Sequence, residues 1–361
     1  MFKEYDPSLG KRLQLLREDG TLTDAAKKFP AMSSDLVLTA FQYMTRARMA
    51  DEWAVSLNRQ GRMPTYAPNK GQEANSMGVL LALRQDDWIV PAFREMAGML
   101  YRGLPLSQLY LYWLGNEMGS SYDVEKFHML PISVPLASQT LHAVGLSYAD
   151  KYRGRDRVAA TFIGDGATSE GDFYEAINFA GAWNTATIFY IQNNQWAIST
   201  PRKMQTAVEV LAIKAKAAGI DGIQIDGNDI FAVYAAATMA AEKARKGGGP
   251  TLIEGYTYRL GAHTTADDPT RYRDESEVCE WLERDPLLRL ERYILAQKLM
   301  SEKQIKELKE KIDLEVKQAF EEADKYPSPT LEDTFRYTYK EMPELLHEQM
   351  ERLKANGMED L

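Results

Sequence analysis

The segment from Val158 to Thr200 constrains the fold most strongly, because it reads as a strand, a helix and a second strand in succession. Val158 to Ile163 is a short apolar run that ends at a glycine turn, as buried strands do. Asp172 to Trp183 reads as a helix whose apolar residues share one stripe, namely Phe173, Ile177, Ala180 and Trp183. Thr187 to Ile191 is a second run of β-branched and aromatic residues. The segment therefore predicts a parallel β-α-β unit.

Polar residues follow both predicted strands. Gly164-Asp165-Gly166 comes after the first, and Asn193-Asn194 comes after the second with 26 intervening residues. Because parallel strands end at the same sheet edge, where ligands bind, Asp165 and Asn194 are expected to lie close together. Glycines and a helix N-terminus favour an anion, but an aspartate about 4 Å from a phosphate repels it by roughly 4 kcal/mol at an effective dielectric of 20. A divalent cation must intervene, and oxygen ligands suit Mg²⁺.

Two other interpretations compete for these motifs. Either fragment alone is more often an ordinary turn or loop. A Rossmann dinucleotide site needs a glycine at position 169 and an acidic residue at the end of the second strand. Position 169 is serine and the second strand ends in Gln192-Asn193-Asn194, so the pattern disfavours a nicotinamide-dependent oxidoreductase.

A longer set of motifs resembles the alpha subunit of the E1 component of 2-oxo acid dehydrogenase complexes, which depends on thiamine diphosphate. The similarity rests on GDGATSEGDFYEAINFAG with NNQWAISTP, and it continues through YAPNKGQEA, VPLASQ, IDGND and YRLGAHTTADDPTRYR. It covers roughly residues 35 to 345. The implied fold is α/β, a mostly parallel sheet flanked by helices. The expected parts are an N-terminal arm (1–33), the thiamine diphosphate-binding domain (34–300) and a C-terminal helical extension (301–361) packed on that domain.

The resemblance also implies a binding site. Asp165, the Asn194 side chain and the Trp196 carbonyl match magnesium ligands, and Gly166 with Ala167 would offer N–H groups to the diphosphate. The other cofactor-binding positions that it implies are Phe93, Arg94, Val134, Leu136, Gly164, Ile198 and His263. An arginine fork suits phosphate oxygens. Relatives often have tyrosine at position 93, so any hydroxyl contact is absent here, and packing explains the two aminopyrimidine positions almost as well.

Histidines and a possible potassium site complete the candidates. The chain has four histidines, and only His263, within RLGAHTTADDPTRYR, matches a family histidine at the active-site mouth. A near-neutral pKa would suit a catalytic role for it. The segment before His128 departs from many relatives, which leaves its role open. Thr264 matches a phosphorylated position of mammalian relatives, but we assert no modification. Some branched-chain relatives hold K⁺ at the positions of Ser133, Ser138 and Gln139, although such groups also cap helices.

The implied reaction is decarboxylation of a 2-oxo acid, followed by acyl transfer to the lipoyl group of E2. Pyruvate is slightly preferred over a branched-chain 2-oxo acid, and an acetoin-cleaving enzyme is a close variant. In heteromeric relatives the glutamate that activates the cofactor comes from the beta chain, so we expect an α2β2 assembly and assign that role to no glutamate here. A noncatalytic scaffold is the remaining alternative, and the retained Asp165, Asn194, Arg94 and His263 oppose it.

Composition agrees with this reading. A chain of 361 residues with 45% apolar content can bury a large core. A net charge of -9 opposes general nucleic-acid binding, and no apolar run is long enough to cross a bilayer. The single Cys279 excludes an intrachain disulfide, and the N-terminal residues do not resemble a signal peptide. These features lead us to expect a cytoplasmic protein.

Overall fold

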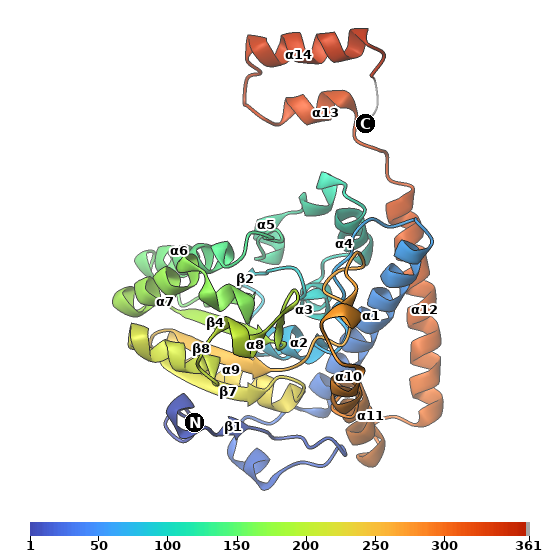
Figure 1. The fold of residues 1–361 in the computed structure, drawn as a ribbon. Helices are drawn as coiled ribbons and strands as arrows, with labels where there is room; N and C mark the ends of the chain where they lie inside the picture. The colour runs from blue at the N-terminus through green and yellow to red at the C-terminus, as the bar shows by residue number, and fades with distance from the viewer. Residues whose placement is uncertain (359–361) are drawn as a thin grey trace.

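A six-stranded sheet forms the centre of the computed structural model, which describes residues 1–358 (Figure 1). Every neighbouring pair is parallel, in the order β1-β7-β8-β4-β3-β2. The strands are β1 (Arg12–Leu13), β2 (Trp88–Val90), β3 (Ala159–Gly164), β4 (Thr187–Asn193), β7 (Asp221–Asp226) and β8 (Thr251–Tyr256). A separate antiparallel pair consists of β5 (Trp196–Ala197) and β6 (Thr200–Pro201). The expected parallel α/β fold is confirmed.

Helices flank the sheet on both faces (Figure 1). The α-helices are α1 (Ser34–Arg59), α2 (Glu73–Ala82), α3 (Met96–Arg102), α4 (Leu106–Trp113), α5 (Val124–Phe127), α6 (Ser138–Tyr152), α7 (Gly171–Trp183), α8 (Arg202–Gln205), α9 (Ile230–Arg245), α10 (Glu275–Leu282), α11 (Pro286–Ala296), α12 (Glu302–Asp324), α13 (Leu331–Arg336) and α14 (Glu344–Ala355). None of the helices in the described part of the chain is both long and apolar enough to cross a membrane.

The two sheet faces bury separate apolar clusters. Along β4, Ile188 and Tyr190 belong to the larger cluster, which includes residues of α1, α2 and α9. The intervening Phe189 and Ile191 belong to a second cluster with residues of α7. Successive strand residues point to opposite faces, so a strand covered on both sides is apolar throughout. This explains why the strand sequences lack an alternating pattern.

The predicted β-α-β unit is confirmed as β3, α7 and β4, with Gly164 paired in register with Gln192. Strand β8 ends at Tyr256. Its backbone continues beside the end of β4, where the N–H of Thr257 donates to the Asn193 carbonyl at 3.0 Å. The chain then bends over the sheet edge, which directs the following loop to the site.

The two ends of the chain contact this framework differently. Near the N-terminus, β1 adds an edge strand beside β7, and the backbone N–H groups of Leu15 and Leu16 donate to the buried Asp229 carboxylate. Near the C-terminus, α12 packs along α1 and α4. Beyond α12, α13 and α14 pair with each other and lie away from the sheet (Figure 1).

Candidate active site

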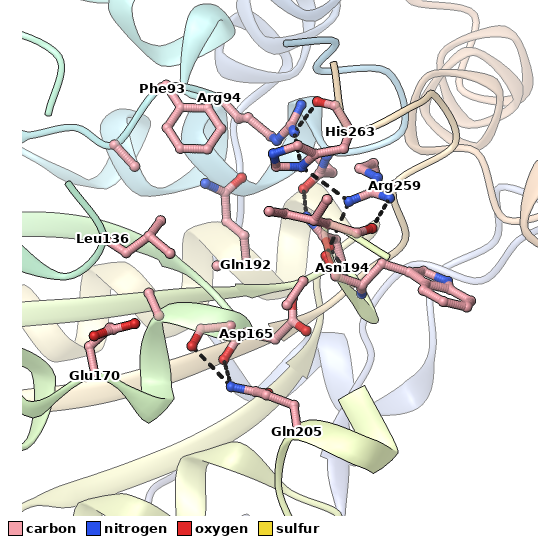
Figure 2. Close-up of a pocket in the computed structure, with 18 of the residues that line it drawn as sticks. Phe93, Arg94, Leu136, Asp165, Glu170, Gln192, Asn194, Gln205, Arg259 and His263 are labelled. Carbon is pink, nitrogen blue, oxygen red and sulfur yellow. Dashed lines mark hydrogen bonds between the residues drawn. The ribbon is translucent and has the colours of Figure 1, made fainter. Parts of the chain in front are cut away.

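A cavity of about 270 Å³ lies at the carboxyl ends of the central strands. The segments that follow β2, β3, β4 and β8 all contribute to its wall, as expected for an open parallel sheet. Figure 2 shows Arg94 and His263 on one side of the cavity and Asp165 on the other. The predicted site residues that line it are Phe93, Arg94, Leu136, Gly164, Asp165, Gly166, Ala167, Asn194, Trp196, Ile198 and His263.

Three oxygen atoms converge at the ends of β3 and β4. The Asn194 side-chain oxygen lies 3.0 Å from the Trp196 carbonyl oxygen and 3.3 Å from Asp165 Oδ1. The Asn194 amide nitrogen points the other way and donates to Gln72 Oε1 at 2.9 Å. In a chain without a cation, the reversed amide would donate to both oxygens instead. A bound cation would favour the Asn194 orientation in which the side-chain oxygen faces Asp165 and the Trp196 carbonyl, so this arrangement fits a metal ion.

The Asp165 carboxylate is buried, and among residues 1–358 it forms no ion pair and its Oδ2 atom has no hydrogen-bond partner. Burial raises its pKa to about 7. A buried unpaired carboxylate is costly unless a cation or proton neutralises it. Among residues 1–358, no group of three or more His, Cys, Asp or Glu side chains could hold a metal. The candidate centre has one carboxylate, one amide and one carbonyl, which is the hard oxygen chemistry that Mg²⁺ accepts.

The Gly164-Asp165-Gly166 turn brings the backbone close to the β5–β6 hairpin. Residues Gly166–Ser169 form a single 3₁₀ turn between β3 and α7. A Cβ atom added at Gly166 would lie 2.7 Å from the Ala197 Cβ, so only glycine fits without a shift. Within the described chain, no backbone hydrogen bond is made by the Gly166 or Ala167 N–H. Both donors are thus available to a ligand.

Two arginines converge on His263 from different loops. Arg94 Nη2 lies 3.2 Å from His263 Nδ1 and donates to the His263 carbonyl at 2.6 Å. Arg259 Nη1 lies 3.4 Å from the same ring nitrogen and donates to the Trp196 carbonyl at 3.2 Å. Burial lowers the pKa of Arg94 to about 10, with Arg259 adding repulsion. The cluster concentrates positive charge on the part of the cavity wall around His263, as an anionic ligand requires.

The tautomer of His263 follows from these contacts. A guanidinium has donors and no acceptor, so His263 Nδ1 must accept and the ring proton must reside on Nε2. Burial, with help from Arg94 and Arg259, lowers the pKa of His263 to about 4. The near-neutral pKa expected from the sequence is therefore wrong. His263 is a neutral ring at physiological pH and is suited to donating a hydrogen bond rather than exchanging protons.

The loop after His263 is held by further polar contacts. The His263 N–H donates to Asp267 Oδ2 at 2.8 Å, and the Tyr272 hydroxyl also donates to Asp267. Arg259 Nη2 donates to that hydroxyl at 2.9 Å, and Arg273 Nη1 donates to the Arg259 carbonyl. These contacts connect the loop to the wall of the cavity.

Two candidates from the sequence lie outside the cavity wall, and a third is the suggested potassium position. Val134 is not in the cavity wall, and its side chain is 55% exposed. His128 is also outside the cavity wall and packs edge-on against Trp88, with ring centres 5.1 Å apart. At the suggested potassium position, the Ser133 and Ser138 hydroxyls lie 2.9 Å apart, and the Gln139 side-chain oxygen is buried without a partner.

Several cavity residues were missed by motif reasoning. Gln192 and Glu95 form a buried pair in which the Gln192 amide donates to the carboxylate, and burial raises the Glu95 pKa to about 7. Gln205 reaches the cavity from α8, and Arg259 from the segment after β8. Glu95 and Arg259 each lie within four residues of a predicted site residue, and this proximity in the sequence is the signal that could have found them. No predicted site residue lies that close to Gln205 in the sequence.

Comparisons with known proteins agree with this geometry. Residues 41–332 match the model of the family described as "Dehydrogenase E1 component". The pyruvate dehydrogenase E1 component subunit alpha of Staphylococcus epidermidis is 42% identical over 343 residues, which is 95% of this chain and 92% of that protein. The protein of the same name in Staphylococcus aureus strain Mu50 is 41% identical over the same share. The chain belongs to the dehydrogenase E1 component family.

Proposed function

We propose that this chain is the alpha subunit of a thiamine diphosphate-dependent E1 enzyme that decarboxylates pyruvate and transfers the acetyl group to the lipoyl group of E2. The observation that carries the proposal is the set of three converging oxygens from Asp165, Asn194 and Trp196. The two relatives named above are both alpha subunits of pyruvate dehydrogenase, which supports pyruvate over the branched-chain and acetoin alternatives.

Each part of the cavity has a role in this proposal. Mg²⁺ would be held by the three oxygens, and the diphosphate by the Gly166 and Ala167 N–H groups with Arg94 and the Nε2–H of His263. When bound, thiamine diphosphate supplies a carbon nucleophile and an electron sink for decarboxylation. Phe93, Leu136 and Ile198 would exclude water from the organic part of the cofactor, with Val134 at the outer rim.

The proposed partners follow from the resemblance to heteromeric E1 enzymes. The glutamate that activates the cofactor would come from a beta chain, giving an α2β2 assembly, and a lipoyl-bearing E2 would accept the acyl group. A K⁺ ion at Ser133, Ser138 and Gln139 would use the unpartnered Gln139 oxygen. The proposed location is the cytoplasm, where the single exposed Cys279 would stay reduced.

Replacing Asp165 with alanine tests the metal site. Removing a residue that only hydrogen-bonds to a metal ligand costs about 10–100-fold in metal affinity. Removing Asp165, which would be a ligand itself, should therefore weaken Mg²⁺-dependent cofactor binding at least about 100-fold. Asp156→Ala is the matched control, because that aspartate is an exposed partner of Arg84. Calorimetric titration of each variant, assembled with the beta chain, measures the effect. Wild-type affinity in Asp165→Ala would overturn the proposed site.

Substrate assays separate the alternatives. The assembled enzyme should decarboxylate pyruvate faster than 3-methyl-2-oxobutanoate or acetoin at equal concentrations. A higher kcat/KM for either competitor would reassign the substrate. Saturable binding of NADH, with no binding of thiamine diphosphate, would instead revive the nicotinamide-dependent alternative.

A further inference from the structure

Gln205 of α8 contacts the turn that follows β3, although 38 residues separate it from Gly166 in the sequence. Its Nε2 atom donates to the Asp165 carbonyl at 2.9 Å, the Gly166 carbonyl at 3.0 Å and the Ser169 hydroxyl at 2.7 Å. In Figure 2 dashed lines connect the Gln205 amide to the turn beside Asp165. Three acceptors around one nitrogen fix the orientation of this amide.

The planarity of the peptide bond gives these contacts a consequence for the cavity. In a trans peptide the C=O and the next N–H point in opposite directions, and no cis peptide occurs in the described chain. When Gln205 holds the carbonyls of Asp165 and Gly166 toward α8, it turns the N–H groups of Gly166 and Ala167 away from α8. These are the two N–H groups that have no backbone acceptor.

The turn needs this external support because its own bonds are weak. It is one short 3₁₀ turn, whose hydrogen bonds have poorer geometry than those of an α-helix. The Asp165 carbonyl also accepts from Thr168 Oγ1 at 2.7 Å, and Lys214 Nζ donates to the Thr168 carbonyl at 2.7 Å. The Lys214 contact acts on the Thr168–Ser169 peptide, outside the pair of peptides that includes the Gly166 and Ala167 donors. Among these contacts, only Gln205 bonds both carbonyls of the pair.

We infer that Gln205 is a positioning residue that aims the Gly166 and Ala167 N–H groups at a diphosphate. The inference rests on the proposed function for the identity of the cofactor, but the aim of the two donors concerns any diphosphate. α8 directly follows the β5–β6 hairpin, which begins at Trp196. Gln205 thus joins the anion-binding turn to the loop that offers the third metal-facing oxygen.

Gln205→Met tests the inference, because methionine keeps the length of the side chain and removes the donor. Misaligning one charge-assisted hydrogen bond is expected to weaken diphosphate binding about tenfold. Two probes are titrated with Mg²⁺ into the complex with the beta chain: thiamine diphosphate and inorganic pyrophosphate. Both should lose affinity by a similar factor, since the positioned donors face the group that the probes share. Met204→Ala is the matched control, because Met204 lies on α8 and is exposed.

Further measurements distinguish positioning from general destabilisation. The apparent cofactor constant of Gln205→Met should rise about tenfold while kcat at saturating cofactor and the melting temperature stay at wild-type values. Gln205→Ala should give the same result, a raised cofactor constant with unchanged kcat and melting temperature. Wild-type affinity of both variants for both probes would overturn the inference and leave the proposed function standing. If wild-type protein binds pyrophosphate but not thiamine diphosphate, and Gln205→Met weakens that binding, the proposed function fails and the positioning role stands.

Discussion

At the scale of single residues, the site is governed by how its buried charges are balanced. Among the described residues the Oδ2 atom of Asp165 has no hydrogen-bond partner, whereas Arg94 and Arg259 both lie beside the neutral ring of His263. Figure 2 shows Arg94 and His263 on the side of the cavity away from Asp165, whereas Arg259 donates to the Trp196 carbonyl at 3.2 Å. A metal diphosphate would satisfy these groups, because its cation would meet the carboxylate and its anion would meet the guanidinium groups.

The protonation of His263 yields a prediction. Its ring should stay neutral, with the proton on Nε2, down to about pH 4. Because the folded pKa is lower than the unfolded pKa, the unfolded chain binds more protons between these values. The contribution of His263 to stability is therefore present above about pH 6.5 and is lost as the pH falls toward 4. Nitrogen-15 histidine NMR measures both the tautomer and the midpoint.

An arginine variant supplies the control for this titration. Arg94→Met removes one positive neighbour, so the His263 midpoint should move up toward its ordinary value. A wild-type midpoint near 6.5, or a proton on Nδ1, would contradict the geometry of the arginine pair.

Residue identity was predictable from the sequence only where a motif pointed directly to the site. Asp165 and Asn194 follow adjacent parallel strands, so topology alone brings them together. Gln205 arrives from a four-residue helix after a hairpin, and no periodic pattern encodes the path of such a segment. The depressed pKa of His263 was also hidden, because it depends on burial and on Arg94, 169 residues away along the chain.

At the scale of elements, the long periodic segments were easier to predict than their ends. In α12, Ile305, Ile312, Val316 and Phe320 recur at helical spacing, and all four are buried against the body of the protein. Strand β8 is harder to delimit, because the segment after Tyr256 continues along the edge of β4 without forming a strand. Periodicity reports burial, but the end of a strand depends on where its neighbour ends.

The packing of α12 can be tested by one pair of substitutions. Phe320 is buried and meets Tyr110 of α4 edge-to-face, with ring centres 5.8 Å apart. Phe320→Ala should lower the free energy of unfolding by about 3–5 kcal/mol. Leu314→Ala, on the exposed side of the same helix, should change it by at most about 0.5 kcal/mol. Urea unfolding monitored by circular dichroism measures both, and equal losses would contradict the packing of this helix.

At the scale of the whole molecule, the cavity mouth is unusually apolar for a surface. Val134, Leu136 and Ile198 are 55%, 51% and 56% exposed and lie in or beside the cavity wall. Exposed apolar side chains around a binding site are typical of a surface that another chain covers. Aromatic residues of α6 and α7 are also exposed, including Tyr148 and Trp183, which contact each other with ring centres 4.8 Å apart.

The last prediction concerns the need for this second chain. The cavity has carboxylates at Asp165, Glu95 and Glu170. Asp165 faces the proposed metal position, Glu95 is bonded to Gln192, and Glu170 is the remaining one. Because the proposed function takes the activating glutamate from the beta chain, Glu170→Gln should leave the activity of the α2β2 enzyme within about twofold. The alpha chain alone should decarboxylate pyruvate at least about 100-fold more slowly, the usual lower bound for losing a general acid or base. Steady-state assays with and without the beta chain, with sedimentation to establish the assembly, measure both effects. Full activity of the isolated chain, abolished by Glu170→Gln, would transfer the activating role to this chain, because the required carboxylate would then already be present at the mouth of its own cavity.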